Sequence, residues 1–328
     1  SELDIIYGDD TLRTNTSGGN DIIYGDAGDD TLYGVTFEEA TENFNKGNFI
    51  EAYDQYSELA LNDDANAQYN IALMNYEGLG INKNEKLAFF WYEKSALNGN
   101  AVAQNNLAHM YHMGEGVKKD LVLAEQWYKL SAEANNPFAQ LNLAMLYELS
   151  TNEEKAKQAF YWYEKASSQG VVIAQNNLGK MYYIGRGTKV DKEKAKYWFT
   201  KASDANNPIA QANLAVMYLN ADGVEEDINK AVDLLTKSAN QNILSSMIKL
   251  ADLYEKGKVV SQDYAKAFYW YNKAVEFDSA QAIFQVGIYY YHGYGIKKDE
   301  ETGISYIRKA KEKGYKRAEN FFKLNNIQ

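Results

Sequence analysis

The chain contains no cysteine among its 328 residues. This absence excludes disulfide bonds, thiolate nucleophiles and cysteine-ligated zinc, although a cysteine-free protein suits either redox compartment. Histidine is nearly absent, with three residues, and proline occurs only twice. No apolar run approaches the ~18 residues of a membrane-spanning helix. We therefore expect a protein without a membrane span and without cysteine-based metal or nucleophile chemistry.

Basic residues are also too few to balance the acidic ones. The formal net charge is −11, from 34 Lys and Arg against 45 Asp and Glu. Residues 1–34 hold seven Asp and one Glu against Arg13 alone, whereas the region from residue 286 onward is basic. Because binding to phosphate backbones requires clustered Lys and Arg, nucleic acid is not expected as the main ligand.

What the sequence does contain is a repeat. The stretch from Ala103 to Ala132, which begins AQNNLAHMYHMGEG, recurs along most of the chain. The residue directly after the repeating Ala recurs every 35 or 36 residues. It is found at Gln68, Gln104, Gln140, Gln175, Gln211, Met247 and Ile283. A period of this length indicates stacked supersecondary units, so the chain is predicted to form a solenoid in which each unit packs mainly on its neighbours.

Each unit has the apolar spacing of two helices. The first helices are predicted at 67–76, 103–113, 139–149, 174–184, 210–220, 246–255 and 282–292. The second helices are marked by Trp91, Trp127, Trp162, Trp198 and Trp270. Gly-x-Gly pairs such as Gly114 and Gly116 follow a helix instead of a strand, so we interpret them as helix C-caps and not as phosphate loops. Pro137 and Pro208 are expected at the first position of a helix.

The pattern AQxNLxxMYxxGxG, followed by A and WYxKA, resembles the Sel-1-like repeats, which are α/α relatives of the tetratricopeptide repeat. The resemblance implies a mostly α fold, an α/α superhelical solenoid of helix pairs. We divide this part of the chain into a TPR-like helix pair (35–66), seven Sel-1-like repeats (67–317) and a C-terminal capping helix (318–328). The unit that starts at Ala139 lacks the Gly-x-Gly turn, and the unit at Ser246 lacks both Ala and Gln.

The first 34 residues follow a different pattern. The sequence DIIYGD occurs at Asp4 and again at Asp21, and Gly25 to Tyr33 fits the nonapeptide G-G-x-G-x-D-x-U-x with Asp26 in place of the second Gly. Glycine permits tight turns with positive φ, and Asp and carbonyl oxygens suit Ca²⁺. Seven Asp side chains in so short a segment would repel one another without a cation.

This segment resembles the RTX, or hemolysin-type, calcium-binding repeats, whose family fold is a parallel β-roll. The resemblance implies a short β-roll-like segment over residues 1–34 with Ca²⁺ as cofactor. The residues that it implies as calcium ligands are Asp9, Asp10, Asp21, Gly25, Asp26, Ala27, Gly28 and Asp30. The alternative is an acidic, Gly-rich turn segment that binds no metal.

A column of carboxamides occupies one offset of the first helices, which in such solenoids line the concave side. It consists of Asn70, Asn106, Asn142, Asn177 and Asn213, continued by Lys249 and Gln285. Carboxamides could bind the backbone of an extended peptide, but hydrogen bonding between repeats explains the column equally well. The next row, which includes His109 and Lys180, varies from repeat to repeat and is where specificity is expected.

No catalytic constellation is recognisable. His109 and His112 are one helical turn apart, but no carboxylate accompanies them at metal-ligand spacing, and the equivalent residues of other repeats vary freely. No Ser has a His–Asp pair in its sequence context. We therefore expect a protein that is not an enzyme.

The sequence predicts a protein-interaction scaffold that binds a protein or extended peptide in the concave groove. One alternative is a structural spacer or stalk in an exported adhesin or toxin, and another is a carbohydrate- or envelope-binding module that uses exposed tyrosines. The RTX resemblance implies a secreted or cell-surface bacterial protein, of which this chain is expected to be one part. A periplasmic protein and an intracellular effector are the alternatives.

Overall fold

The computed structural model describes residues 35–325, which form α-helices connected by short loops and contain no strand. The calcium-binding segment predicted over residues 1–34 lies outside the described residues, so its β-roll remains a prediction. The helices of residues 35–325 are α1 (Phe37–Asn45), α2 (Phe49–Leu61), α3 (Ala65–Glu77), α4 (Glu85–Leu97), α5 (Ala101–Met113), α6 (Leu121–Glu133), α7 (Pro137–Glu148), α8 (Glu153–Ser168), α9 (Val172–Ile184), α10 (Lys192–Asp204), α11 (Pro208–Asn220), α12 (Ile228–Asn240), α13 (Leu244–Lys256), α14 (Tyr264–Val275), α15 (Ala280–His292), α16 (Glu300–Glu312) and α17 (Lys316–Leu324).

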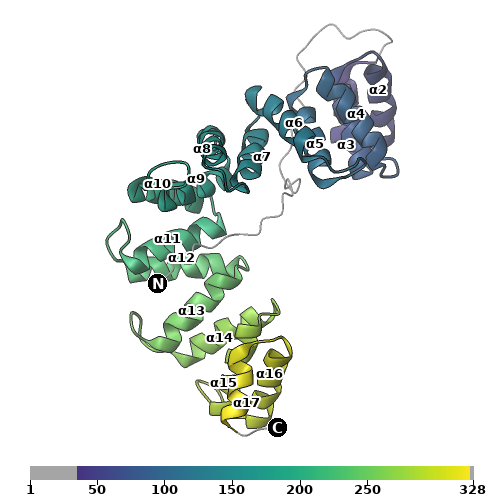
Figure 1. Cartoon of the computed structure of the whole chain (residues 1–328). Coiled ribbons are helices and arrows are strands. Elements are labelled where there is room, and N and C mark those ends of the chain that lie inside the picture. The colour runs from purple at the N-terminus through teal and green to yellow at the C-terminus, as the bar shows by residue number, and fades with distance from the viewer. Residues whose placement is uncertain (1–34, 326–328) are drawn as a thin grey trace. The chain divides into compact units, whose positions relative to one another are not determined.

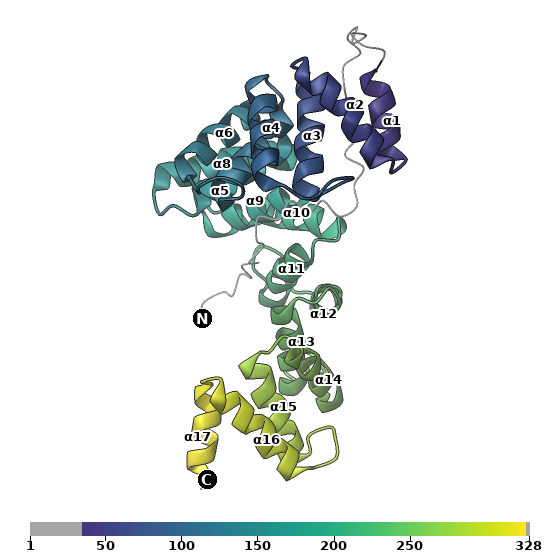
Figure 2. The same ribbon diagram turned by 90° about the vertical axis from the view of Figure 1, so that its right-hand side faces the viewer.

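These helices pack as consecutive hairpins. The described chain divides into an N-terminal unit, made of residues 35–174 with 186–188, and a C-terminal unit, made of residues 175–185 with 189–325. In the N-terminal unit the hairpins α1/α2, α3/α4, α5/α6 and α7/α8 follow one another, as Figure 1 shows for α3 to α6. In the C-terminal unit α13/α14 is followed by α15/α16, and α17 packs on α16 (Figure 2). The prediction of paired helices is confirmed.

Side-chain caps determine where the first helices begin. Asp64, Asn100 and Asn136 each accept a hydrogen bond from the backbone N–H of the repeating Ala, three residues later. The helices therefore start two residues before that Ala, earlier than the sequence pattern indicated, because an N-cap side chain satisfies an otherwise unpaired amide of the first turn. The two prolines occupy the first helical turn, as predicted.

The Gly-x-Gly pairs end the first helices, which confirms their interpretation as caps. Gly78, Gly114 and Gly293 are left-handed C-caps with φ of 75°, 82° and 77°. The second glycine has a different role. A Cβ on Gly116 would lie 2.3 Å from the carbonyl oxygen of Glu85, so this position allows the loop after α5 to lie directly on the start of α4.

The aromatic residues of the second helices pack between hairpins. Trp91 of α4 contacts both the core cluster around Tyr56 and Ile71 and the cluster around Tyr92 and Leu107. The tyrosine that follows this Trp is the more buried ring, since Tyr92 is only 2 % exposed. Trp91, which marks a second helix in the sequence, thus packs between hairpins, and the structure adds buried tyrosines on the second helices, namely Tyr92, Tyr128, Tyr163 and Tyr271.

The glutamines of the repeat also join hairpins. Gln68 Nε2 donates to the Ala60 carbonyl at the end of α2 at 3.1 Å, and Gln68 Oε1 accepts from Asn98 Nδ2 at 3.0 Å. Gln140 repeats this arrangement, donating to the Ala132 carbonyl at 3.2 Å and accepting from Gln169 at 2.8 Å. The Ala-Gln pair thus has a structural role, which is to link the ends of successive second helices.

Candidate protein-binding face

Large apolar side chains are exposed on one face of α5 and α7. Val102 and Met113 of α5 are 43 % and 47 % exposed, and Phe138 and Leu149 at the equivalent positions of the next repeat are 54 % and 78 % exposed. Eleven residues make about three helical turns, so both members of each pair lie on the same side of their helix. We define the first-helix face as Val102, Asn106, His109 and Met113 together with Phe138, Asn142, Met145 and Leu149.

The predicted asparagine column lies at this face but is only partly accessible. Asn142 is 6 % exposed, and its Nδ2 donates to Asn105 Oδ1 at 3.0 Å. Asn105 Nδ2 in turn donates to Asn106 Oδ1 at 3.2 Å. These bonds join α5 to α7, as expected if the amides hold neighbouring repeats together. Asn106 is half-buried and is therefore the amide of this group that a partner could reach.

The same arrangement occurs in the C-terminal unit. Asn213 Nδ2 donates to Asn176 Oδ1, and Asn176 Nδ2 donates to Asn177 Oδ1, both at 3.1 Å. Asn213 is buried and Asn177 is half-buried. At the start of the column, Asn70 is completely buried beside the Tyr56 hydroxyl. Three of the five predicted asparagines are thus enclosed by neighbouring helices.

The other predicted contact residues have diverse environments. Lys249 is exposed, whereas Lys180 is only 9 % exposed. Gln285 is buried and donates to the Tyr271 hydroxyl at 3.3 Å. His109 Nδ1 lies 3.8 Å from a Glu115 carboxylate oxygen. These four residues therefore do not form one continuous exposed surface.

Glu115 links His109 to the preceding repeat. Its carboxylate accepts a hydrogen bond from the Tyr76 hydroxyl at 2.7 Å. Burial raises the pKa of Tyr76, and the hydrogen bond to Glu115 raises that pKa further, because ionising the phenol would place two negative charges side by side. Tyr76 therefore remains a hydrogen-bond donor at neutral pH, and it fixes the Glu115 carboxylate beside the first-helix face.

The four exposed apolar residues of the face were not among the predicted contact residues. They stand one turn before and one turn after the positions that the sequence singled out. A signal was present, because Val102 and Phe138, and likewise Met113 and Leu149, are apolar on the side of the helix that faces away from the buried alanines. Apolar residues opposite the core-facing side are the pattern of an interaction surface.

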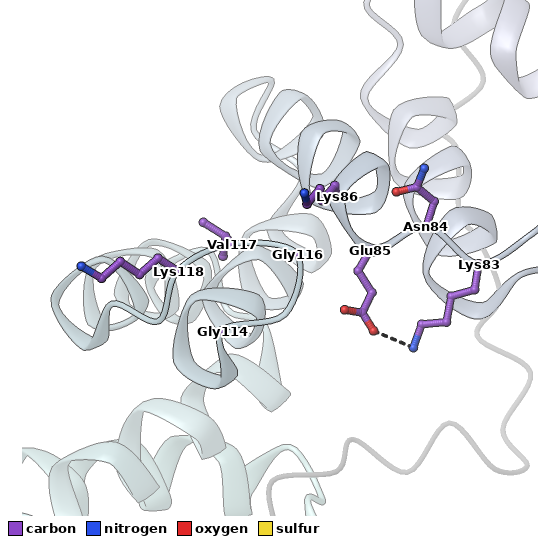
Figure 3. A pocket seen from close by; sticks show the side chains of 8 residues that line it. All are labelled: Lys83, Asn84, Glu85, Lys86, Gly114, Gly116, Val117 and Lys118. Carbon is purple, nitrogen blue, oxygen red and sulfur yellow. Dashed lines mark ion pairs between the residues drawn. The ribbon is translucent and has the colours of Figure 1, made fainter.

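A hollow in the N-terminal unit lies between the start of α4 and the loop after α5 (Figure 3). Lys83, Lys86 and Lys118 line it with Glu85, and Lys83 Nζ lies 2.9 Å from a Glu85 carboxylate oxygen. The Lys118 ammonium points away from that ion pair (Figure 3). These side chains do not converge on a common point, so they do not form a general acid–base pair or an anion clamp.

Across residues 35–325, no group of three or more His, Asp or Glu side chains is placed to hold a metal ion. Within that range, no helix has both the length and the apolar character needed to cross a bilayer.

Similar proteins identify the repeat. The Sel1 repeat matches residues 65–100, 101–136, 137–171, 172–207, 208–243, 244–276 and 280–315. No curated protein matches the chain. Among solved structures, the chain is similar to a Sel1 repeat protein from Oxalobacter formigenes, with 25 % identity, a TM-score of 0.71 and coverage of 87 % of this chain and 86 % of that one.

A second similar structure is c5321, described as a protective antigen present in uropathogenic Escherichia coli strains that displays an SLR fold. It is 26 % identical, with a TM-score of 0.67 and coverage of 85 % of this chain and 69 % of that one. Repeat solenoids of this kind are typical of protein-interaction scaffolds. With seven matched repeats over more than half its length, the chain belongs to the Sel1 repeat family.

Proposed function

We propose that the protein is a non-enzymatic scaffold whose first-helix face binds a segment of a partner protein. The observation that carries the proposal is the exposure of Val102, Met113, Phe138 and Leu149 on consecutive first helices. Exposed apolar side chains that are scattered singly need no explanation, but four at equivalent positions of adjacent helices form a patch, and such patches mark interaction sites.

The amides between the apolar residues support a polypeptide as the ligand. Asn106 lies between Val102 and Met113 on α5, and its Oδ1 accepts from Asn105. This bond fixes the orientation of the side chain. A carboxamide offers both donor and acceptor groups, so it can match a peptide backbone while the apolar residues take up side chains.

The experiment is a selection of peptides from a displayed library against the whole chain, followed by affinity measurement on variants. Phe138→Ser and Leu149→Ser should each weaken the selected peptides by roughly 5- to 100-fold, because truncating a buried contact at an interface costs about 1–3 kcal/mol. Val122→Ser is the matched control. Val122 is 68 % exposed but belongs to α6, outside the first-helix face.

Two results would contradict the proposal. One is that all selected peptides bind Phe138→Ser and Leu149→Ser as tightly as the parent protein. The other is that Val122→Ser weakens them equally. The first is also what a spacer or stalk with an unused face predicts, so this experiment separates the scaffold from the structural alternative.

The proposal includes the segment before Val35. On the resemblance of residues 1–34 to calcium-binding repeats, we propose that this segment binds Ca²⁺ and caps the first helices, in a protein that is secreted or displayed on a bacterial surface. The loop from Gly25 to Asp30 fits the nonapeptide pattern best; Asp30 occupies the Asp position of that pattern, and Asp26 lies in the same loop, in place of the second Gly. This part is independent of the first-helix face and has its own test, given in the Discussion.

A further inference from the structure

The hairpin α5/α6 contains a buried polar pair in which the two members are not hydrogen-bonded. His112 of α5 is 8 % exposed, Tyr128 of α6 is fully buried, and their ring centroids are 6.3 Å apart. Neither His112 Nδ1 nor Tyr128 Oη has a hydrogen-bond partner among the described residues. A buried polar group without a partner costs about 1–3 kcal/mol.

In two other repeats of this chain, a carboxylate accepts a hydrogen bond from the buried tyrosine hydroxyl. In the next hairpin the equivalent residues are Glu148 and Tyr163, and the Tyr163 hydroxyl donates to Glu148 Oε2 at 2.6 Å. In the hairpin α13/α14 the Tyr271 hydroxyl lies at hydrogen-bond distance from two carboxylates, Asp252 Oδ1 at 2.5 Å and Glu255 Oε2 at 3.1 Å. His112 occupies the position of Glu148 and Glu255, but it accepts no hydrogen bond from the Tyr128 hydroxyl, which therefore has no partner among the described residues.

The surroundings of His112 disfavour its charged form. Its pKa lies below the ordinary value of 6.5, because burial penalises the imidazolium and because Lys119 and His109 add positive charge nearby. The helices that carry the neighbouring repeats offer little compensation. The first helices α3 and α7 carry only Glu77 and Glu148, and Glu148 is hydrogen-bonded to Tyr163. The second helices α4 and α8 carry acidic and basic residues in equal number: Glu85, Lys86, Glu93 and Lys94 on α4, and Glu153, Glu154, Lys155, Lys157, Glu164 and Lys165 on α8. Within the hairpin itself, α6 carries Glu125, Lys129 and Glu133.

We infer that His112 makes the α5/α6 hairpin a pH-sensitive element, which packs tightly with a neutral imidazole and loosens when that imidazole takes up a proton. The direction follows from proton linkage. The unfolded chain binds the proton near pH 6.5 and the folded hairpin only at lower pH, so stability is full above 6.5 and falls as the pH drops below that value.

The consequence for binding rests on the proposed function. Because α5 carries Val102, Asn106 and Met113, loosening this hairpin would disorder half of the first-helix face. A partner bound there would be released on acidification. The stability change itself does not depend on any partner, so it can be measured even if the first-helix face binds nothing.

The experiment is amide hydrogen exchange on the whole chain at about pH 7.5 and about pH 5.5, on either side of the ordinary value of 6.5. After correction for the intrinsic pH dependence of exchange, the amides of α5 and α6 should lose protection at the lower pH more than those of α15 and α16. His112→Gln should abolish this difference. The matched control, His109→Gln, removes the neighbouring histidine of the same helix and should preserve it.

His112→Glu provides the converse change. It recreates the pairing of Glu148 with Tyr163, so the hairpin should keep its protection at the lower pH. The inference is overturned if His112→Gln and the parent chain lose protection equally, or if the loss is spread evenly over all helices. Should these variants fail to fold, the His112 imidazole can be titrated by NMR in the parent chain, and a midpoint at or above 6.5 also overturns it.

Discussion

The guanidinium of Arg186, in the loop after α9, donates hydrogen bonds to the carbonyl oxygen of Glu148 at the end of α7, at 2.5 Å, and to that of Ser150, at 2.7 Å. The helix α7 is the one that lost its Gly-x-Gly turn and ends instead at Leu149 in a right-handed conformation. The last carbonyls of a helix have no partner within it, so a side chain from the next repeat satisfies them here.

Replacing Arg186 should therefore destabilise the end of the α7/α8 hairpin. Because hydrogen bonds from charged donors contribute about 1.5–3 kcal/mol, Arg186→Ala should lower the free energy of unfolding of the N-terminal unit by about 1–3 kcal/mol. Both bonds come from one guanidinium nitrogen, Nη2, whose two N–H groups are fixed in a plane. Arg186→Lys should recover only part, since an ammonium has freely rotating donors and is more strongly hydrated. Denaturant titration measures the change, and Lys189→Ala, an exposed residue of the same loop, should have little effect. Equal stability of Arg186→Ala and the parent would refute the capping role.

Gly116 should be far less tolerant of substitution than Gly99, although both have positive φ. In Gly116→Ala the new methyl group would lie 2.3 Å from the Glu85 carbonyl oxygen, so the contact between the loop and α4 must open. The same change at Gly99 meets nothing within 4 Å and adds only backbone strain, about 1–2 kcal/mol. Thermal unfolding of the two variants side by side gives the comparison, and similar losses at both sites would count against the close approach.

Ala221 ends α11 in the left-handed conformation, with φ of 52°, where α3, α5, α13 and α15 use glycine. Ala221→Gly should raise the free energy of unfolding by up to about 1 kcal/mol, because it removes the clash of Cβ with the backbone but adds freedom to the unfolded chain. Ala205 also ends a helix, but with φ of −81°. Ala205→Gly should be neutral or destabilising, and a gain at Ala205 equal to that at Ala221 would show that conformation is not the cause.

Calcium should protect the segment before the solenoid. Arg13 is the only Lys or Arg in residues 1–34, so trypsin can cut that segment at one place. If Asp26 and Asp30 help to bind Ca²⁺, adding Ca²⁺ should slow cleavage after Arg13 and EDTA should restore it, whereas Mg²⁺ should do little because it requires tighter octahedral geometry. Asp26→Asn with Asp30→Asn should lose the protection. A cleavage rate indifferent to Ca²⁺ would leave the segment without a calcium role.

The sequence by itself determined the repeat, the helix pairs and the roles of the special backbone residues. The 36-residue spacing of Ala, Gln and Trp predicted the hairpins, because each hairpin must bury the same apolar stripe against the next. Gly114 as a C-cap and Pro137 at a helix start followed from local conformational preference alone. Such features depend on neighbouring residues in the chain, and they can be read without coordinates.

Only the tertiary structure decided what each polar side chain of the repeat does. Asn106 and Asn142 occupy the same offset, yet Asn142 is enclosed by a bond to Asn105 and Asn106 remains within reach of a partner. Likewise, only the tertiary structure shows that His112 Nδ1 is buried next to Tyr128 without a hydrogen-bond partner. Burial and hydrogen bonding in a solenoid are set by the adjacent repeat, about 36 residues away in sequence, so identical positions acquire different roles through their neighbours in space.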